Sequence, residues 1–228
     1  GFAQSLYEYC KRYLPAQLLL GVIRPVIISR YAANSDFKAA VRLTETFFKV
    51  NALMLSPLLV VLLVVGPEIV EVISKGKYGS ESSLILVFLI IVLFFETARM
   101  QLDVLVQAIE RYHYLIFANV FLTVSIIPSV YLLNYFGAWI MPALNLLGLA
   151  LSNGIVLRKL WSNGYCYSHD WDSTCRIVVI SAITYMVSSI FDYFFPNLWI
   201  VTCLLIGLIY SVLVLLIYRK QLSDMLSS

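Results

Sequence analysis

Charged residues are scarce in this chain. Asp, Glu, Lys and Arg together make up 13% of its 228 residues, whereas hydrophobic residues make up 61%. Soluble proteins average about 25% charged and about 45–50% apolar residues. A water-soluble domain of this length could not bury that excess in one core, so the composition excludes a soluble globular protein. We accordingly expect a lipid bilayer, and no nucleic acid, among its partners.

Nucleotide-binding and hydrolytic motifs are also missing. The sequence contains no G-x-x-x-x-G-K-[ST], G-x-G-x-x-G, H-E-x-x-H or G-x-S-x-G pattern. Its four cysteines form no C-x-x-C pair, and the loop around His169 has no recognised zinc spacing. We therefore expect a protein that is not an enzyme and holds neither a metal nor another cofactor. The absence of a phosphate-binding loop argues against ATP hydrolysis, so energy for any transport would come from another source, such as an ion gradient.

Long apolar runs dominate the rest of the chain. A spanning helix needs about 20 mostly apolar residues, and hydrocarbon favours helices because every backbone group must bond internally. Strands of a membrane barrel would alternate polar and apolar residues, and these runs do not. The sequence thus predicts an all-α integral membrane bundle of about seven transmembrane helices. The runs are 14–29, 47–66, 83–102, 114–136, 138–157, 177–195 and 198–218.

Lys and Arg are concentrated in alternate connections between these runs. The segment 30–49, the third and fifth links and the tail at 219–220 carry them, whereas the fourth and sixth links carry none. The positive-inside rule therefore places the basic links in the cytoplasm and the N-terminal stretch outside. The second link, 67–79, is predicted to form a short amphipathic helix on the outer face, ended by its glycines.

One polar, aromatic link is longer than the others and separates two groups of spans. From it we predict a five-span transporter lobe at 1–160, a cytoplasmic loop at 161–175, and a terminal two-helix hairpin with its tail at 176–228. None of the links is long enough to form a soluble domain.

Arg24 lies inside an apolar run, where ionisable groups are costly enough to indicate function. Gln17, Gly21 and Arg24 recur at i, i+4 and i+7 and so share one helix face, and Pro25 favours a kink there. A guanidinium is always charged and suits bidentate contact with phosphate. Gln17 and Arg24 are thus predicted to form a cationic site for an anionic headgroup. Alternatively, Arg24 reaches a membrane interface or pairs with an acid on a neighbouring helix.

A second polar stripe begins at the end of the third run. Its members are Glu96, Arg99, Asp103, Gln107 and Glu110. Their separations of 3, 4, 4 and 3 residues predict one face of one helix. This face either lines a central cavity, with a coupling carboxylate, or continues into the cytoplasm as a solvated surface. We assign Glu96 and Arg99 to the cavity and the remaining three to the solvated surface.

Three stretches resemble polysaccharide flippases of the O-antigen type, in the multidrug/oligosaccharidyl-lipid/polysaccharide exporter superfamily. One is an Arg-Pro helix and basic loop at 21–42, which includes ISRYAANSDFKAAVRL. The next is a span, an amphipathic helix and a Gly-Lys-Tyr-Gly turn, LLVVGPEIVEVISKGKYGSES. The third is ETARMQLDVLVQAIERYHYLIFANV. The resemblance covers 1–160, about two thirds of the chain, and the last two spans match only as a terminal pair.

The resemblance implies an architecture and a function. Members have twelve to fourteen spans in two lobes, so seven spans imply the second, C-terminal lobe. They are taken to flip undecaprenyl-diphosphate-linked oligosaccharides across the bacterial plasma membrane by alternating access. The implied partners are that substrate and the missing N-terminal lobe, and the first residue, Gly1, indicates a fragment or a processed piece. Arg24 carries over best as a cationic cavity residue, followed by Arg99 and Glu96.

Other functions stay open. A cation-coupled multidrug exporter of the same superfamily would use acidic cavity residues, whereas Arg24 favours an anionic substrate. The lipid II flippase branch is a relative that the sequence does not separate. A membrane-embedded sugar polymerase would carry a large outer loop, and the outer links here are short. An acyltransferase would place a histidine in or near the membrane, but His113 and His169 fall in predicted cytoplasmic links.

Overall fold

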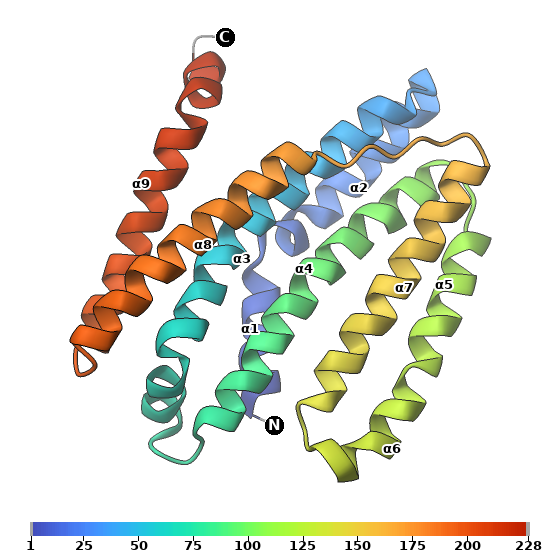
Figure 1. The fold of residues 1–228 in the computed structure, drawn as a ribbon. Coiled ribbons are helices and arrows are strands. Elements are labelled where there is room, and N and C mark those ends of the chain that lie inside the picture. Colours follow the sequence, from blue (N-terminus) through green and yellow to red (C-terminus); the bar gives the residue numbers. More distant parts are fainter. Residues whose placement is uncertain (1, 227–228) are drawn as a thin grey trace. The chain divides into compact units, whose positions relative to one another are not determined.

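The computed structural model describes residues 2–226, with the side chains of residues 16, 19, 20 and 219–226 outside that description. All regular structure in this range is α-helical (Figure 1). The helices are α1 (Phe2–Tyr13), α2 (Pro15–Asn34), α3 (Phe37–Ser74), α4 (Ser80–Ala108), α5 (His113–Val124), α6 (Ile126–Phe136), α7 (Ile140–Ser162), α8 (Trp171–Phe194) and α9 (Trp199–Leu226).

Six candidate membrane spans are present among the described residues, by length and composition. They are α3, α4, the α5–α6 segment, α7, α8 and α9 up to Tyr218. The predicted all-α membrane architecture is confirmed, and six of the seven predicted spans fall on these helices. The other prediction, 14–29, falls on α2, which is helical but not among the six. Part of that prediction, like the basic residues of the tail at 219–220, concerns side chains outside the description.

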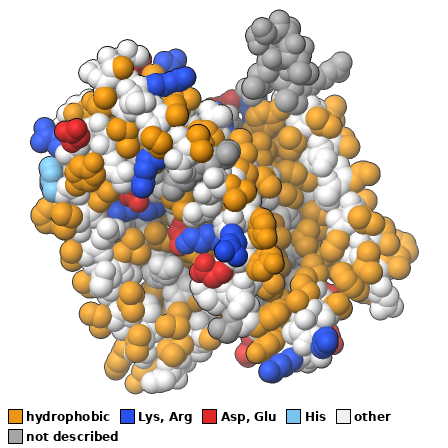
Figure 2. Space-filling view, turned by 180° about the vertical axis from the view of Figure 1, so that it is seen from behind, with side chains coloured by type: hydrophobic (Ala, Val, Ile, Leu, Met, Phe, Trp, Pro, Cys, Tyr) orange, Lys and Arg blue, Asp and Glu red, His pale blue; other side chains and the backbone are white. Residues whose placement is uncertain are grey.

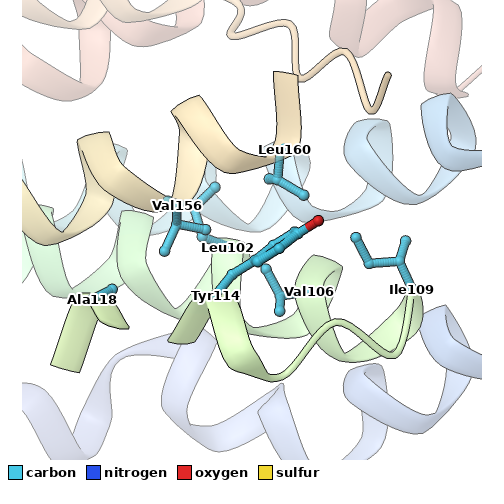
Figure 3. Close-up of a cluster of buried hydrophobic side chains, with 7 residues drawn as sticks. All are labelled: Leu102, Val106, Ile109, Tyr114, Ala118, Val156 and Leu160. Atoms are coloured by element: carbon cyan, nitrogen blue, oxygen red, sulfur yellow. The ribbon is translucent and has the colours of Figure 1, made fainter. Parts of the chain in front are cut away.

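The first compact unit comprises Gly1–Ala52 and Leu84–Asp170. Helix α4 has the largest buried share of the six candidate spans, because apolar side chains pack on it from two directions. One cluster joins it to α5 and α7 (Figure 3), where the Tyr114 ring lies among Val106, Val156 and Leu160. The other cluster joins α2, α3 and α4 and includes Ile27, which is 1% exposed.

A tight approach brings α7 against the junction of α5 and α6. A Cβ atom added at Gly148 would lie 2.5 Å from Ser125 Oγ and 3.0 Å from Ser125 Cβ. Small residues allow transmembrane helices to approach closely enough for backbone and side chains to interlock. Gly154, two turns later in α7, has nothing within 4 Å of such an atom.

We expect Gly148→Ala and Gly154→Ala to change stability in opposite directions. The methyl group at 148 forces Ser125 to shift, at a cost of about 1–3 kcal/mol for overpacking. The methyl group at 154 meets open space and removes the helix penalty of glycine, a gain of about 0.5–1 kcal/mol. Thermal unfolding of both variants in one detergent measures the difference, and equal melting temperatures would contradict the close approach.

Polar contacts tether the loop between α7 and α8 to α3. Glu45, 5% exposed, accepts hydrogen bonds from Tyr167 Oη at 2.5 Å and from the Asp170 N–H at 3.4 Å, and it contacts His169 Nδ1 at 2.9 Å. Lys49 pairs with Asp170 at 2.5 Å. Burial and the Glu45 carboxylate raise the pKa of Tyr167 above its usual range, so the phenol keeps the proton that it donates. The loop therefore has a defined path.

The second compact unit comprises Leu53–Ser83 and Trp171–Ser228. Helices α8 and α9 form an antiparallel pair, in which Thr184, Ser188 and Thr202 are fully buried. Helix α3 departs from helical geometry at Val65 (φ −123°, ψ 23°), two residues before Pro67. The proline ring is the cause, since it clashes with the preceding turn. The predicted helix at 67–79 is thus joined to its span and ends at Ser74.

Two predicted boundaries need correction. Glu110 does not share the helical stripe, because α4 ends at Ala108 and Glu110 has a left-handed φ of 58°. The predicted loop at 161–175 is shorter, since α7 reaches Ser162 and α8 begins at Trp171.

The two compact units also group residues 53–83 with 171–228, a pairing that chain order does not indicate. The division into a five-span lobe and a terminal hairpin stays a prediction.

Candidate functional site

Five charged side chains from α1, α2 and α4 come together in the first unit, and we name them the charged cluster. They are Lys11, Arg24, Glu96, Arg99 and Asp103. Figure 2 shows Lys, Arg and acidic side chains gathered among hydrophobic ones on one face. With three cations and two acids, the cluster has a formal excess of one positive charge.

Helix α1 contributes a lysine and a tyrosine that both bind Glu96 of α4. Lys11 Nζ lies 2.8 Å from Glu96 Oε2, and Tyr7 Oη donates to Glu96 Oε1 at 2.7 Å. Tyr7 is 4% exposed. Because the Glu96 carboxylate has a cation on one oxygen and a hydroxyl donor on the other, its charge is compensated at this depth.

Arg99 is enclosed by partners from three helices. Its Nε pairs with Asp103 Oδ1 at 2.9 Å, one turn further along α4. Its Nη1 donates to Ser152 of α7 at 2.5 Å and its Nη2 donates to Asn119 of α5 at 2.9 Å. With 7% exposure, Arg99 does not lie on a solvated cytoplasmic face. Asp103, predicted to lie on such a face, is 30% exposed and ion-paired. A cavity role for Arg99 stays a prediction.

Arg24 differs from the other two cations of the cluster. It is half-buried on α2, and within residues 2–226 its buried Nε has no hydrogen-bond partner. It interacts electrostatically with Asp103, but it makes no ion pair with the described side chains, whereas Lys11 and Arg99 each hold an acid. A buried polar atom without a partner is costly and rare in folded proteins. Within the described residues, Arg24 therefore has no partner for its buried Nε and no acid in an ion pair.

Gln17 lies beside the charged cluster on the α1 side. Its Nε2 contacts Met100 Sδ of α4 at 3.7 Å. It also lines an open hollow of about 420 Å³ together with Lys11, Arg12 and Glu8. Of the four predicted site residues, the described structure places Glu96, Arg99 and Arg24 in the cluster and Gln17 at its edge.

Tyr7 and Lys11 are parts of the site that sequence reasoning missed. They are four residues apart in a helix and so project from the same face. That spacing is the one signal in the sequence. The residue that Lys11 binds, Glu96 of α4, is 85 residues away along the chain. No periodicity within one helix could have identified the pair.

Comparison with known proteins supports a fold and leaves the family open. No family model matches the chain, and no curated protein matches it. Among solved structures, lipid II flippase MurJ in an inward closed conformation matches with a TM-score of 0.72 at 17% identity. The chain has a MurJ-like fold.

The match covers 96% of this chain and 48% of the MurJ chain, so this chain spans about half the length of that flippase. The six apolar helices among the described residues and the MurJ-like fold together describe a multi-pass membrane protein. At this identity the likeness concerns the arrangement of helices and carries no information on the roles of individual side chains.

Proposed function

We propose that this chain is the C-terminal lobe of a flippase. The flippase moves an undecaprenyl-diphosphate-linked oligosaccharide across the bacterial plasma membrane by alternating access. The observation that carries the proposal is Arg24, a half-buried cation with a partnerless Nε within the described residues, on a helix of a MurJ-like fold. Arg24 lies in the predicted span 14–29, and an ionisable residue within a span marks a substrate or ion pathway by default.

The balance of charge in the cluster favours an anionic substrate. Glu96 compensates Lys11 and Asp103 compensates Arg99, so the excess positive charge resides at Arg24. A diphosphate would bind the free guanidinium, because charge-assisted hydrogen bonds from Arg to phosphate are strong and bidentate. Lys11, 28% exposed, can offer a second contact if phosphate replaces Glu96.

The remaining predicted site residues have supporting roles in this proposal. Gln17, at the hollow between α1 and α2, would contact the sugar or the diphosphate. Glu96 holds Lys11 in the empty site, and Arg99 fixes α4 against α5 and α7 so that Asp103 stays near Arg24. The missing N-terminal lobe would close the other side of the cavity, in keeping with the half-length match to MurJ.

A second candidate is a cation-coupled multidrug exporter. The observation in its favour is that two carboxylates, Glu96 and Asp103, lie at depth in the same cluster. Each already pairs with a cation, so the polysaccharide precursor remains our proposal. The MurJ likeness also makes lipid II an alternative cargo within the first proposal.

A flipping assay distinguishes these candidates. The product of the complete gene is reconstituted into proteoliposomes that contain a fluorescent undecaprenyl-diphosphate-linked oligosaccharide. A membrane-impermeant quencher removes the outer-leaflet fluorescence in every sample, and we expect further loss of the inner-leaflet fluorescence only when the protein is present, with competition from unlabelled precursor. Export of an organic cation without flipping would instead support the multidrug exporter, and flipping of lipid II alone would correct the cargo.

A further inference from the structure

A separate basic hollow lies where α2 meets α3, with none of its residues in the charged cluster. Its volume is about 390 Å³, and its lining includes Arg30, Tyr31, Asn34 and Arg42 beside the apolar Ile27 and Leu43. Neither the flippase proposal nor the resemblance assigns a role to these residues.

The hollow is electropositive. One acid, Asp36, also lines it, but its Oδ1 accepts the Ala39 N–H at 3.0 Å and caps the start of α3. Arg30 and Arg42 are exposed and make no ion pair with any side chain of the described range. Two guanidinium groups therefore face one carboxylate that is already engaged.

The wall of the hollow is apolar and rigid. Ile27 is 1% exposed and Ala40 is 4% exposed, and both belong to the core cluster that joins α2, α3 and α4. An apolar wall beside two guanidinium groups fits an amphiphile with an anionic head better than it fits a free anion, because a free anion would leave the wall wetted.

The position of the hollow along α2 and α3 indicates which kind of amphiphile would bind there. The hollow lies at the C-terminal end of α2 and the first turns of α3, separated by a turn in which Ser35 has a φ of 52°. The positive-inside rule places this end at the cytoplasmic surface, where anionic lipids concentrate and basic pockets between helices bind their headgroups. We propose that this hollow binds the phosphate headgroup of an anionic phospholipid, with Arg30 and Arg42 as its phosphate ligands.

A matched control is present one helical turn away. Lys38 is exposed at the start of α3 and is not among the residues that line the hollow. Lys38→Gln removes one positive charge from the same turn of the membrane surface without touching the site. If lipid were attracted to basic residues in general, Lys38→Gln and Arg30→Gln would reduce lipid binding equally. If the hollow is a specific site, Arg30→Gln alone would reduce it.

Native mass spectrometry of the protein from its complete gene, released from nanodiscs, tests the proposal. The nanodiscs contain equal phosphatidylglycerol and phosphatidylcholine. We expect wild type to retain phosphatidylglycerol at least fivefold over phosphatidylcholine, Lys38→Gln to behave as wild type, and Arg30→Gln/Arg42→Gln to lose the preference. Thermal unfolding reports whether the double variant folds, and the two single variants replace it if it does not.

Three results would overturn the site. These are retention of the lipid preference in the Arg variants, an equal loss in Lys38→Gln, and full displacement of phosphatidylglycerol by millimolar inorganic phosphate. The last would identify a soluble anion as the ligand. The measurement needs no transport, so its failure would leave the flippase proposal intact, and failure of flipping would leave this site intact.

Discussion

Arg24→Gln is expected to reduce flipping strongly at limiting substrate concentration while the protein stays folded. The substitution removes the guanidinium and keeps a shorter, neutral polar side chain. Loss of one charge-assisted hydrogen-bonding group costs about 1.5–3 kcal/mol, which corresponds to a weakening of substrate affinity of about 10- to 100-fold. The assay is flipping of the fluorescent precursor in proteoliposomes, together with surface polysaccharide in complemented cells.

Two further variants make the Arg24 result interpretable. Arg24→Lys keeps the charge without the bidentate fork, and we expect partial activity. Arg158→Gln removes an exposed Arg from α7, outside the charged cluster, and we expect wild-type flipping. Normal surface polysaccharide in cells that carry Arg24→Gln would contradict the proposed cationic role of Arg24. An equal loss of flipping in Arg158→Gln would show that the Arg24 effect is a general effect of charge.

Arg99→Ala is expected to destabilise the first unit by roughly 3 kcal/mol, as removal of one partner from a buried ion pair does. Three partners lose their donor, because Asp103, Asn119 and Ser152 all bind the one guanidinium. Of these, Asp103 matters most, since its partly buried carboxylate loses its ion-pair partner and an unpaired charge costs more to bury than a neutral polar group. Thermal unfolding in detergent measures the loss.

A conservative variant separates structure from transport at this position. Arg99→Lys keeps a cation for Asp103 but gives up the fork that reaches Asn119 and Ser152, so an intermediate melting temperature is expected. If Arg99→Ala kept the wild-type melting temperature and still lost flipping, the predicted cavity role would replace the structural one. If both properties were unchanged, neither role would stand.

Most of the candidate site could be predicted because its residues are polar or charged and interrupt runs that are otherwise apolar. Arg24 and Glu96 stand out for this reason alone, and Gln17 follows from helical spacing. The pairing of Arg99 with Asp103 is similarly local, since i and i+4 side chains meet on any helix. Spacing could not show whether each charged side chain has a partner, because the partners lie on neighbouring helices.

The sequence by itself determined that this protein is a bundle of membrane helices, and it placed six of the predicted spans on the six candidate helices, although α3 extends well beyond the predicted 47–66 at both ends. Hydrophobic length and local periodicity are properties of a single segment, so they can be read without knowing its neighbours. Only the tertiary structure decided that Lys11 neutralises Glu96, that Arg99 is enclosed and that the buried Nε of Arg24 has no partner among the described residues. Apart from the amphipathic α1, the helices that these contacts join are mostly apolar. Because such helices offer many faces of similar character, the packed partner cannot be chosen from the residues of one helix alone.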